Sequence, residues 1–237
     1  MQNSENPHPL LIPFSIIIAG ALIGAGVYFS GITKQNTDLH TNTTIGTVNI
    51  RPVSSDDHIL GNPNAAVMIV EYSDPECPFC KQFHSTMQRI MDEYGRDGNV
   101  AWVYRQFPIV GLHKKAPYEA QATECAAEIG GNSKFWEYTT ALYNRTESND
   151  SFNTDDLPKL AKEMNIDESK FTDCLKSGRM KARVDEDIRD AQAAGFEGTP
   201  MSVLITRSGK KVTIEGSQTF DTMKSIIDIA LAEEGKK

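Results

Sequence analysis

Two cysteines separated by two residues lie at the junction between an apolar strand and an amphipathic helix. Residues 67–70 form a short apolar run, which is typical of a strand buried on both faces of a sheet. From residue 78 to about residue 94, apolar side chains recur at spacings of three and four, which indicates a helix. The motif Cys77-Pro78-Phe79-Cys80 therefore begins the helix, and Pro78 suits its first position. The chain must fold so that a buried strand leads directly into a helix that carries two thiols.

The order of the remaining elements predicts an α/β fold with an inserted helical subdomain. Residues 100–107 resemble a second strand, so a parallel pair with a right-handed crossover helix is expected. Helical periodicity then continues through an insert at about residues 112–197, with a break at Gly130-Gly131. Two strands, at residues 202–206 and 211–215, and a last helix follow, and the second strand alternates as an edge strand does. The helix-capping residues that we expect are Ser133, Thr154 or Asp155, Asp167 and Thr219.

The position of the two cysteines at a helix start favours redox chemistry. A thiolate is the nucleophile of thiol–disulfide exchange, and the N–H groups and dipole of a helix N-terminus stabilise it. Cys77 is then the exposed, acidic thiol, and Cys80 lies in the first helical turn, where it can resolve a mixed disulfide.

Zinc binding is the main alternative for this motif. A zinc site would need two more cysteine or histidine ligands at matching spacing. Cys125 and Cys174 are single residues with no cysteine or histidine within five positions, so redox chemistry is favoured and no metal site is expected. A binding module that only docks partners is a further alternative, which the zinc content of the purified protein would help to test.

Cys125 and Cys174 each lie on the apolar face of a predicted helix. If Cys77 and Cys80 form the local pair, a disulfide between Cys125 and Cys174 is the remaining one, and it would join two helices of the insert. Buried free thiols are the alternative. The bridge is favoured if the compartment is oxidising.

Residues 10–32 contain no charged side chain and no histidine. As a helix, this run of about 23 residues spans roughly 35 Å, enough to cross a membrane. A cleaved signal peptide is the alternative, but no basic residue precedes the run. We therefore expect a tail at residues 1–9, an anchor at residues 10–33, a flexible polar linker at residues 34–57 and a folded domain at residues 58–234.

The sequence gives weaker evidence on the orientation of the chain in the membrane and on its binding partners. Lys34 favours a cytoplasmic C-terminal side, but one lysine is weak evidence against translocation of a long domain. Gly20 and Gly24 offer one route to helix dimerisation. The net charge of −8, from 24 Lys and Arg against 32 Asp and Glu, argues against a basic nucleic-acid binder.

The motifs together resemble the DsbA family of thioredoxin-fold disulfide oxidoreductases, particularly its membrane-tethered members. The resemblance covers about residues 58–234 and depends on the run V-E-Y-S-D-P-E-C-P-F-C-K-Q-F, the helical insert and Gly198-Thr199-Pro200. It implies that Cys77 attacks, that Cys80 resolves and that Pro200 is a cis-proline facing the disulfide. Thr199 would contact the substrate backbone beside Pro200.

The resemblance also concerns three further residues: it implies roles for Glu71 and Phe79, and it includes His113 without indicating what His113 does. Glu71 lies where such enzymes often carry a buried acid that exchanges protons, although a glutamate at a strand end that reaches solvent is equally consistent. Phe79, a substrate-binding candidate, replaces the histidine of the most oxidising members, which predicts a milder oxidant. His113 also matches a family feature, but no chemical role follows from it.

The sequence therefore predicts a membrane-anchored thiol:disulfide oxidoreductase that needs no cofactor. It would donate the Cys77–Cys80 disulfide to reduced secreted proteins on the outer side of the cytoplasmic membrane, with the N-terminus inside. The resemblance also implies a quinone-linked membrane partner that reoxidises the dithiol. A reductase or isomerase of the same fold is the alternative.

Overall fold

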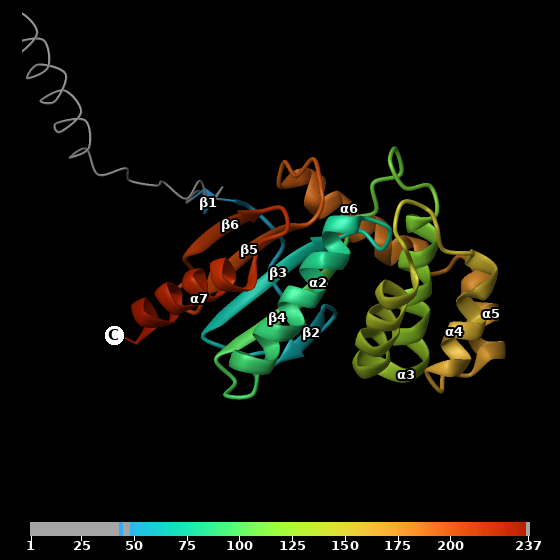
Figure 1. The fold of residues 1–237 in the computed structure, drawn as a ribbon, viewed down its shortest axis with the longest axis horizontal. Helices are drawn as coiled ribbons and strands as arrows, with labels where there is room; N and C mark the ends of the chain where they lie inside the picture. Colours follow the sequence, from blue (N-terminus) through green and yellow to red (C-terminus); the bar gives the residue numbers. More distant parts are fainter. Residues whose placement is uncertain (1–42, 45–47, 236–237) are drawn as a thin grey trace, which may run out of the picture. The chain divides into compact units, whose positions relative to one another are not determined.

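The computed structural model describes residues 43–44 and 48–235 of the chain (Figure 1). These residues form a six-stranded sheet in the order β1-β6-β5-β3-β4-β2. The central strands β3 and β4 are parallel, as predicted, and the other neighbouring strands are antiparallel. The strands are Thr43–Thr44 (β1), His58–Gly61 (β2), Val67–Ser73 (β3), Val100–Gln106 (β4), Met201–Thr206 (β5) and Lys211–Glu215 (β6).

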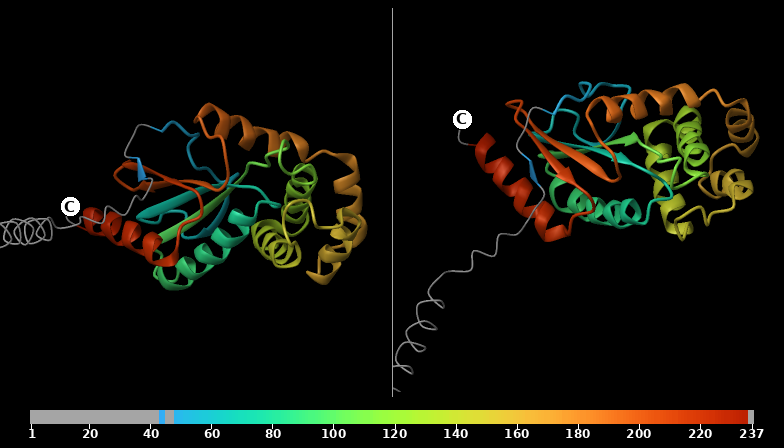
Figure 2. Two further views of the ribbon diagram at one scale, coloured as in Figure 1. Left: turned by 45° about the horizontal axis from the view of Figure 1, so that its top comes forward. Right: turned by 90° about the horizontal axis from the view of Figure 1, so that it is seen from above.

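Helices cover both faces of the sheet, as Figure 2 shows from above. Helices α2 (Pro78–Ile90) and α7 (Phe220–Glu234) pack on one face, over a core built around Val67, Ile69 and Trp102. A short π-helix (Met91–Gly95) extends α2. Helix α6 (Lys181–Ala193) packs on the other face, over residues that include Val70 and Tyr72. Because side chains alternate along a strand, β3 contributes to both cores.

The insert between β4 and β5 forms a third core with its own disulfide. It comprises α3 (Ala116–Arg145), a 3-10 turn (Thr154–Asp156), α4 (Leu157–Glu163), α5 (Glu168–Ser177) and α6. The predicted break in α3 is confirmed at Gly131, whose φ of 75° is non-helical. The predicted Cys125–Cys174 disulfide is present and joins α3 to α5, with Cα atoms 5.8 Å apart.

Of the four predicted helix caps, two are confirmed and two differ. Ser133 lies inside α3, and its hydroxyl donates to the side chain of Glu137 at 2.9 Å instead of capping a helix. The side chain of Asp167 accepts hydrogen bonds at the start of α5, and that of Thr219 does so at the start of α7. Asn153, rather than Thr154 or Asp155, caps the 3-10 turn that leads into α4. The difference is one position along a run of residues that can all cap a helix.

The folded domain begins earlier than the sequence predicts. Residues 48–57 were assigned to a flexible linker, but Ile50 is buried against β3 and β4. In addition, β1 pairs with β6, so β6 is not an edge strand as its alternation suggested. The linker prediction failed here because its charged residues are paired inside the protein instead of being solvated.

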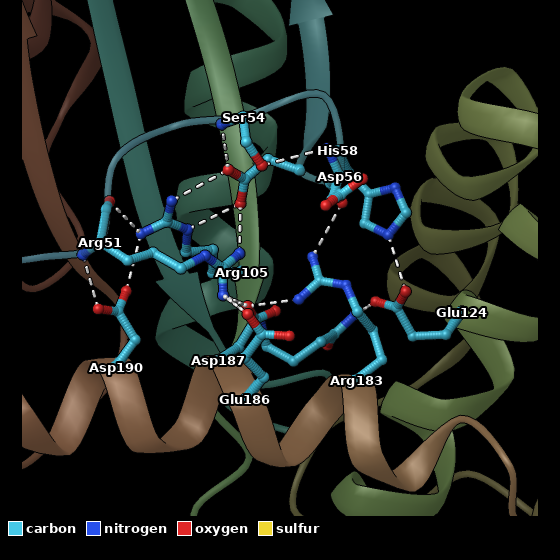
Figure 3. A network of polar contacts seen from close by, with 12 residues as sticks. Arg51, Ser54, Asp56, His58, Arg105, Glu124, Arg183, Glu186, Asp187 and Asp190 are labelled. Atoms are coloured by element: carbon cyan, nitrogen blue, oxygen red, sulfur yellow. Dashed lines mark hydrogen bonds and ion pairs between the residues drawn. The ribbon is translucent and has the colours of Figure 1, made fainter.

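A network of buried ion pairs fixes this segment (Figure 3). Arg105 of β4 is fully buried and contacts Asp57 at 2.9 Å and Asp190 of α6 at 2.7 Å. Arg51 contacts the same Asp57 at 2.6 Å and Asp187 of α6 at 2.8 Å. Removing one partner of such a buried pair typically costs about 3–5 kcal/mol, because the other charge is left unpaired. The network therefore fastens residues 51–57 to both β4 and α6.

The predicted anchor at residues 10–33, with Gly20 and Gly24, lies outside the described residues, as do the tail before it and Lys34. Among the residues that the structure describes, no helix combines the length and apolar character needed to cross a membrane.

Candidate active site

Cys77 caps the N-terminus of α2, as the sequence predicts. It has extended backbone angles (φ −78°, ψ 123°), and Pro78 follows within the first turn. Its N–H donates to the Asp74 carbonyl at 3.2 Å, and its own carbonyl accepts from the N–H of Lys81 at 3.0 Å. The side chain is only 5% exposed, so the expectation of an exposed nucleophile is wrong.

The pKa values of the two thiols are shifted in opposite directions. A hydrogen bond from the Cys80 thiol is the main factor that lowers the pKa of Cys77 to about 6. Burial opposes this shift, while the backbone N–H groups of Cys80 and Phe79 and the side chain of Thr199 add to it. Burial raises the pKa of Cys80 well above its ordinary value. At neutral pH Cys77 is thus mainly a thiolate, which accepts a hydrogen bond from the protonated thiol of Cys80.

The loop before β5 faces the nucleophile. The Thr199–Pro200 peptide bond is cis, so that prediction is confirmed. The Thr199 carbonyl lies 3.5 Å from Sγ of Cys77. The structure thus brings together residues more than 120 positions apart in the sequence. A polypeptide that lies against this loop would pass beside the sulfur atom.

Glu71 is buried beneath the motif, so the alternative that it reaches solvent is wrong. It is the fifth residue of the seven-residue strand β3, and its carboxyl is completely buried. The indole N–H of Trp102 donates to its Oε2 at 2.8 Å. Burial raises the pKa of Glu71 to about 7, and the nearby charge of Cys77 adds to the shift. The carboxyl can therefore gain or lose a proton at neutral pH, as proton exchange with a buried thiol requires.

Asp74 and His113 form a buried pair that the sequence did not predict. Nδ1 of His113 lies 2.9 Å from Oδ2 of Asp74, which also accepts the N–H of Ile109 at 2.7 Å. Although burial opposes it, the Asp74 carboxylate raises the pKa of His113. The Asp74 carboxylate thereby ties the loop after β4 to the residues just before Cys77. The sequence offered two clues to this pair: Asp74 lies three residues before Cys77, and His113 matches a family feature.

A second unpredicted pair joins the insert to the residue before Cys77. Glu76 and Glu119 of α3 are both completely buried, and the two carboxyls interact electrostatically. Burial, followed by the charge of Glu76, raises the pKa of Glu119 to about 9. Thr146 donates its hydroxyl to Oε1 of Glu76 at 3.0 Å. Glu119 is therefore protonated at neutral pH. Sequence periodicity gave no reason to pair these two residues.

An exposed phenyl ring lies within the motif. Phe79 is 61% exposed, so packing in the core does not determine which residue occupies this position. Val110 and Leu112, in the loop that Asp74 fixes, are also exposed large apolar residues. The described residues contain no group of three or more potential metal ligands.

Comparisons with solved structures identify the same architecture. The protein matches the crystal structure of Pseudomonas aeruginosa DsbA2 with a TM-score of 0.64 and 27% identity, covering 75% of this chain and 96% of that one. Oxidised BdbD from Bacillus subtilis matches with a TM-score of 0.68 and 24% identity, over 78% of this chain and 98% of that one. Wolbachia pipientis alpha-DsbA1 matches with a TM-score of 0.66 and 20% identity, over 77% and 94% of the two chains.

The fold and the pair of thiols at the start of α2 resemble those of the DsbA-like thiol:disulfide oxidoreductases. A family model described as thioredoxin matches residues 54–229, and the chain belongs to this thioredoxin family.

The curated relatives that match in sequence are much longer proteins, named as Na(+)/H(+) antiporters. The chain is 31% identical over 159 residues to the Na(+)/H(+) antiporter NhaA 1 of Mycolicibacterium gilvum, which covers 66% of this chain and 24% of the relative. It is 33% identical over 150 residues to the Na(+)/H(+) antiporter NhaA 3 of Salinispora tropica, over 63% and 22% of the two. The chain thus spans about a quarter of the length of the curated relatives it matches.

Proposed function

We propose that the protein donates the Cys77–Cys80 disulfide to reduced proteins that fold outside the cytoplasmic membrane. The single observation that carries this direction is the asymmetry of the two thiols. The pKa of Cys77 is lowered to about 6 and that of Cys80 is raised by burial. A stabilised thiolate favours the reduced form of the enzyme, and a stable reduced form makes its disulfide a strong oxidant.

The reaction follows from the position of the sulfur atoms. A substrate thiolate attacks Sγ of Cys77, and the Cys77–Cys80 bond breaks with its electron pair passing to Cys80. Cys80, in its buried site, takes up a proton. A second substrate thiolate then attacks the substrate sulfur of the mixed disulfide and releases Cys77 as a thiolate. The substrate gains one disulfide, and the enzyme is left as the dithiol.

Two groups of residues assist these steps. The Thr199 carbonyl, 3.5 Å from Cys77, and Pro200 form the surface against which the substrate backbone lies. Phe79 adds an exposed apolar contact for an unfolded chain. Glu71 exchanges the proton that Cys80 needs, since its pKa of about 7 allows both protonation states at neutral pH.

The cellular setting is part of the proposal. Residues 10–33 anchor the chain in the cytoplasmic membrane with the N-terminus inside, and the disulfide-containing domain faces outward. The Cys125–Cys174 disulfide supports an oxidising compartment. A quinone-linked membrane enzyme reoxidises Cys77 and Cys80 after each cycle.

The reduction potential of Cys77–Cys80 in the purified full chain tests the proposal, measured by equilibration with glutathione. A value near −120 mV, in the region of strong oxidants, supports disulfide donation. A value near −270 mV, in the region of thioredoxin, would mean that the protein is a reductant and would overturn the proposed direction. A Cys77→Ser variant with the second pair intact is the control for any contribution from Cys125–Cys174.

A further inference from the structure

The backbone N–H of Asp74 contacts the sulfur atom of the resolving cysteine. In this structure Cys77 and Cys80 are both free thiols, and the N–H of Asp74 donates to Sγ of Cys80 at 3.4 Å. Asp74 and Cys80 are both completely buried. When a Cys77–Cys80 disulfide breaks, negative charge develops on the sulfur of Cys80, and a buried N–H directed at it stabilises that charge. The position of this N–H therefore affects how easily Cys80 leaves.

A tight turn that begins at Asp74 links this contact to the nucleophile. The Asp74 carbonyl accepts the N–H of Cys77 at 3.2 Å, and Oδ1 of Asp74 accepts the N–H of Glu76 at 2.8 Å. An aspartate that bonds the backbone two residues further on is typical of the first position of such a turn. The backbone of Asp74 thus contacts both cysteines, through its carbonyl at Cys77 and through its N–H at Cys80.

The second carboxylate oxygen of Asp74 is held by the loop after β4, at residues 107–115. This oxygen, Oδ2, lies 2.9 Å from Nδ1 of His113 and accepts the N–H of Ile109 at 2.7 Å. Because a carboxylate can only accept, Nδ1 of His113 is the donor. The two donors belong to one turn, since the N–H of His113 donates to the Ile109 carbonyl at 2.9 Å. Both side chains of the pair are buried, so water does not compete for these contacts.

Contacts with the helical insert fix this arrangement from two sides. The N–H of Lys115, at the end of the loop, donates to Oδ1 of Asp150 at 2.8 Å. The hydroxyl of Tyr143 on α3 donates to the Asp74 carbonyl at 3.1 Å and lies 3.0 Å from the hydroxyl of Ser73. The loop therefore presents its imidazole from a fixed base, and the carbonyl of the turn is held independently.

The Asp74 side chain has two opposing effects on the departure of Cys80. Its negative charge, by itself, disfavours a second negative charge on the nearby sulfur. Its hydrogen bonds to Glu76, Ile109 and His113 instead keep the backbone N–H directed at that sulfur. Three donors shared between two oxygens also offset part of the carboxylate charge. The two effects predict rate changes of opposite sign when the carboxylate is replaced by an amide.

We propose that Asp74 and His113 are positioning residues of the redox site, which hold the Asp74 N–H on Sγ of Cys80 and so ease the departure of Cys80 when the disulfide is attacked. This inference rests on the proposed function, in which a substrate thiolate attacks Sγ of Cys77. A bond forms between the substrate sulfur and Cys77, and the S–S bond breaks with its electron pair passing to Cys80. The Asp74 N–H stabilises that charge until Cys80 takes up a proton. A better stabilised leaving thiolate is displaced faster.

The test measures how fast dithiothreitol reduces the Cys77–Cys80 disulfide of the oxidised full chain at pH 7, followed by mass spectrometry after acid quenching. The second thiol of dithiothreitol completes the reaction intramolecularly, so the attack on Cys77 limits the rate. In His113→Ala, we expect the rate constant to fall about tenfold, as for a weakened hydrogen bond to a charged group. In His113→Asn, the amide nitrogen can take the place of Nδ1, and the rate constant should stay within about threefold of the wild-type value.

Asp74→Asn determines which effect of the carboxylate dominates. The amide leaves one oxygen for three donors, so the N–H is held less well, but the negative charge is also removed. We expect the rate constant to fall about tenfold, because position dominates. The double variant with His113→Ala should be no slower than the slower single variant, since both changes release the same N–H. A rise in the rate constant of Asp74→Asn would mean that charge dominates and would overturn the proposal.

His58→Ala is the matched control. Nε2 of His58 lies 2.8 Å from Oε2 of Glu124, and this buried histidine–carboxylate pair joins β2 to α3. Its removal should lower stability but leave the rate constant within about twofold of the wild-type value, because the site is distant from the change. A loss of rate equal to that in His113→Ala would assign the effect to general loosening of the fold and would overturn the proposal.

A spectroscopic measurement locates the effect at the N–H itself. The amide proton of Asp74 faces Sγ of Cys80, so its NMR chemical shift should differ between the disulfide and dithiol forms. We expect this difference to shrink in His113→Ala and to persist in His113→Asn. If it is unchanged in His113→Ala, His113 does not hold the N–H in place, and its role is overturned.

The outcomes separate this inference from the proposed function. Equal rate constants in the wild-type protein, His113→Ala and Asp74→Asn overturn the role of the pair, and so do equal losses in His113→Ala and His113→Asn. If His113→Ala does not fold, Asp74→Asn decides alone. A reduction potential typical of a reductant overturns the proposed direction. Dithiothreitol still attacks the same disulfide in that case, so the same rate constants decide the role of the pair.

Discussion

The indole N–H of Trp102 donates to the buried Glu71 carboxyl at 2.8 Å, and this links an optical probe to the acid beneath the redox motif. The carboxyl has a pKa of about 7, raised mainly by burial. Ionisation of this carboxyl near neutral pH should therefore change the fluorescence of the indole ring that is hydrogen-bonded to it.

We expect the fluorescence of Trp102 to titrate with a midpoint near pH 7, and Glu71→Gln to abolish this transition. The amide keeps a hydrogen-bond acceptor for Trp102 but cannot ionise. Cys77→Ala is the control, because it removes the other nearby titration while keeping that of Glu71 at a somewhat lower pH. An identical transition in Glu71→Gln would show that another group is responsible.

Replacing Cys80 should make Cys77 less acidic. The hydrogen bond from Cys80 is the largest influence that lowers the pKa of Cys77 to about 6. In Cys80→Ala, the midpoint for alkylation of Cys77 by iodoacetamide should rise from about 6 towards the ordinary value of about 8.5. Cys77→Ala should show no alkylation in this range, because Cys80 is buried and has a raised pKa. A midpoint that stays at 6 in Cys80→Ala contradicts this explanation.

Phe79→His should increase the oxidising strength of the site. A protonated histidine between the cysteines would stabilise the Cys77 thiolate, and Phe79 is exposed enough to be replaced without loss of packing. A decrease of one unit in the pKa of Cys77 corresponds to a change of roughly tenfold in the equilibrium constant with glutathione. Phe79→Asn provides a polar but uncharged control. If the pKa of Cys77 in Phe79→His equals or exceeds the wild-type value, the histidine does not make the site more oxidising and the prediction is wrong.

Removing the insert disulfide should lower stability without changing the redox motif. Cys125→Ala/Cys174→Ala is expected to reduce the free energy of unfolding by roughly 4 kcal/mol, from the added chain entropy of the unfolded state. Urea unfolding of the wild-type and double-variant proteins measures this difference. Alkylation of Cys77 should keep its midpoint near pH 6 in the variant. Equal stability of the two proteins would mean that the bridge adds nothing to the packing of the insert.

Glu119→Gln should stabilise the protein increasingly as the pH rises. The pKa of Glu119 is about 9 in the folded protein against an ordinary value of 4.5, so folding requires its protonated form. The wild-type free energy of unfolding should therefore lose a contribution steadily between about pH 4.5 and pH 9, and the amide avoids this loss. Urea unfolding at pH 5 and pH 8 gives the comparison.

Glu128→Gln supplies the control for that experiment. Glu128 is on the same helix but exposed, and its hydrogen bond with Arg179 lowers its pKa. Its substitution should change stability by the same amount at pH 5 and at pH 8. If Glu119→Gln behaves in this way too, Glu119 is not protonated in the folded protein.

Local sequence patterns were enough to predict the redox motif and much of the fold. The strand, the motif and the helix are contiguous, so periodicity alone placed Cys77 at the start of α2. The insert was recognisable because its helices end at glycines such as Gly178, which has a φ of 66°. The family resemblance added the cis bond before Pro200.

The supporting residues of the site could not be predicted because their partners are distant in the sequence. Ser73 and Tyr143 are 70 positions apart, and Asp74 and His113 are 39 apart. No periodicity relates such pairs, and a tyrosine on an apolar helix face is expected to be a core residue. Residues 48–57 were misjudged for a similar reason, since Arg51 finds its partners on α6.

If the protein donates disulfides as proposed, the disulfide in its insert makes it a substrate of its own reaction. Cys125 and Cys174 are both completely buried, so the packed insert shields the bond from other thiols. Once the insert has packed, the thiolate of another copy cannot reach these sulfur atoms. Each new molecule thus needs one disulfide from an outside oxidant or from an older copy during maturation. Afterwards, it can exchange the Cys77–Cys80 bond repeatedly without risk to the one that supports its own fold.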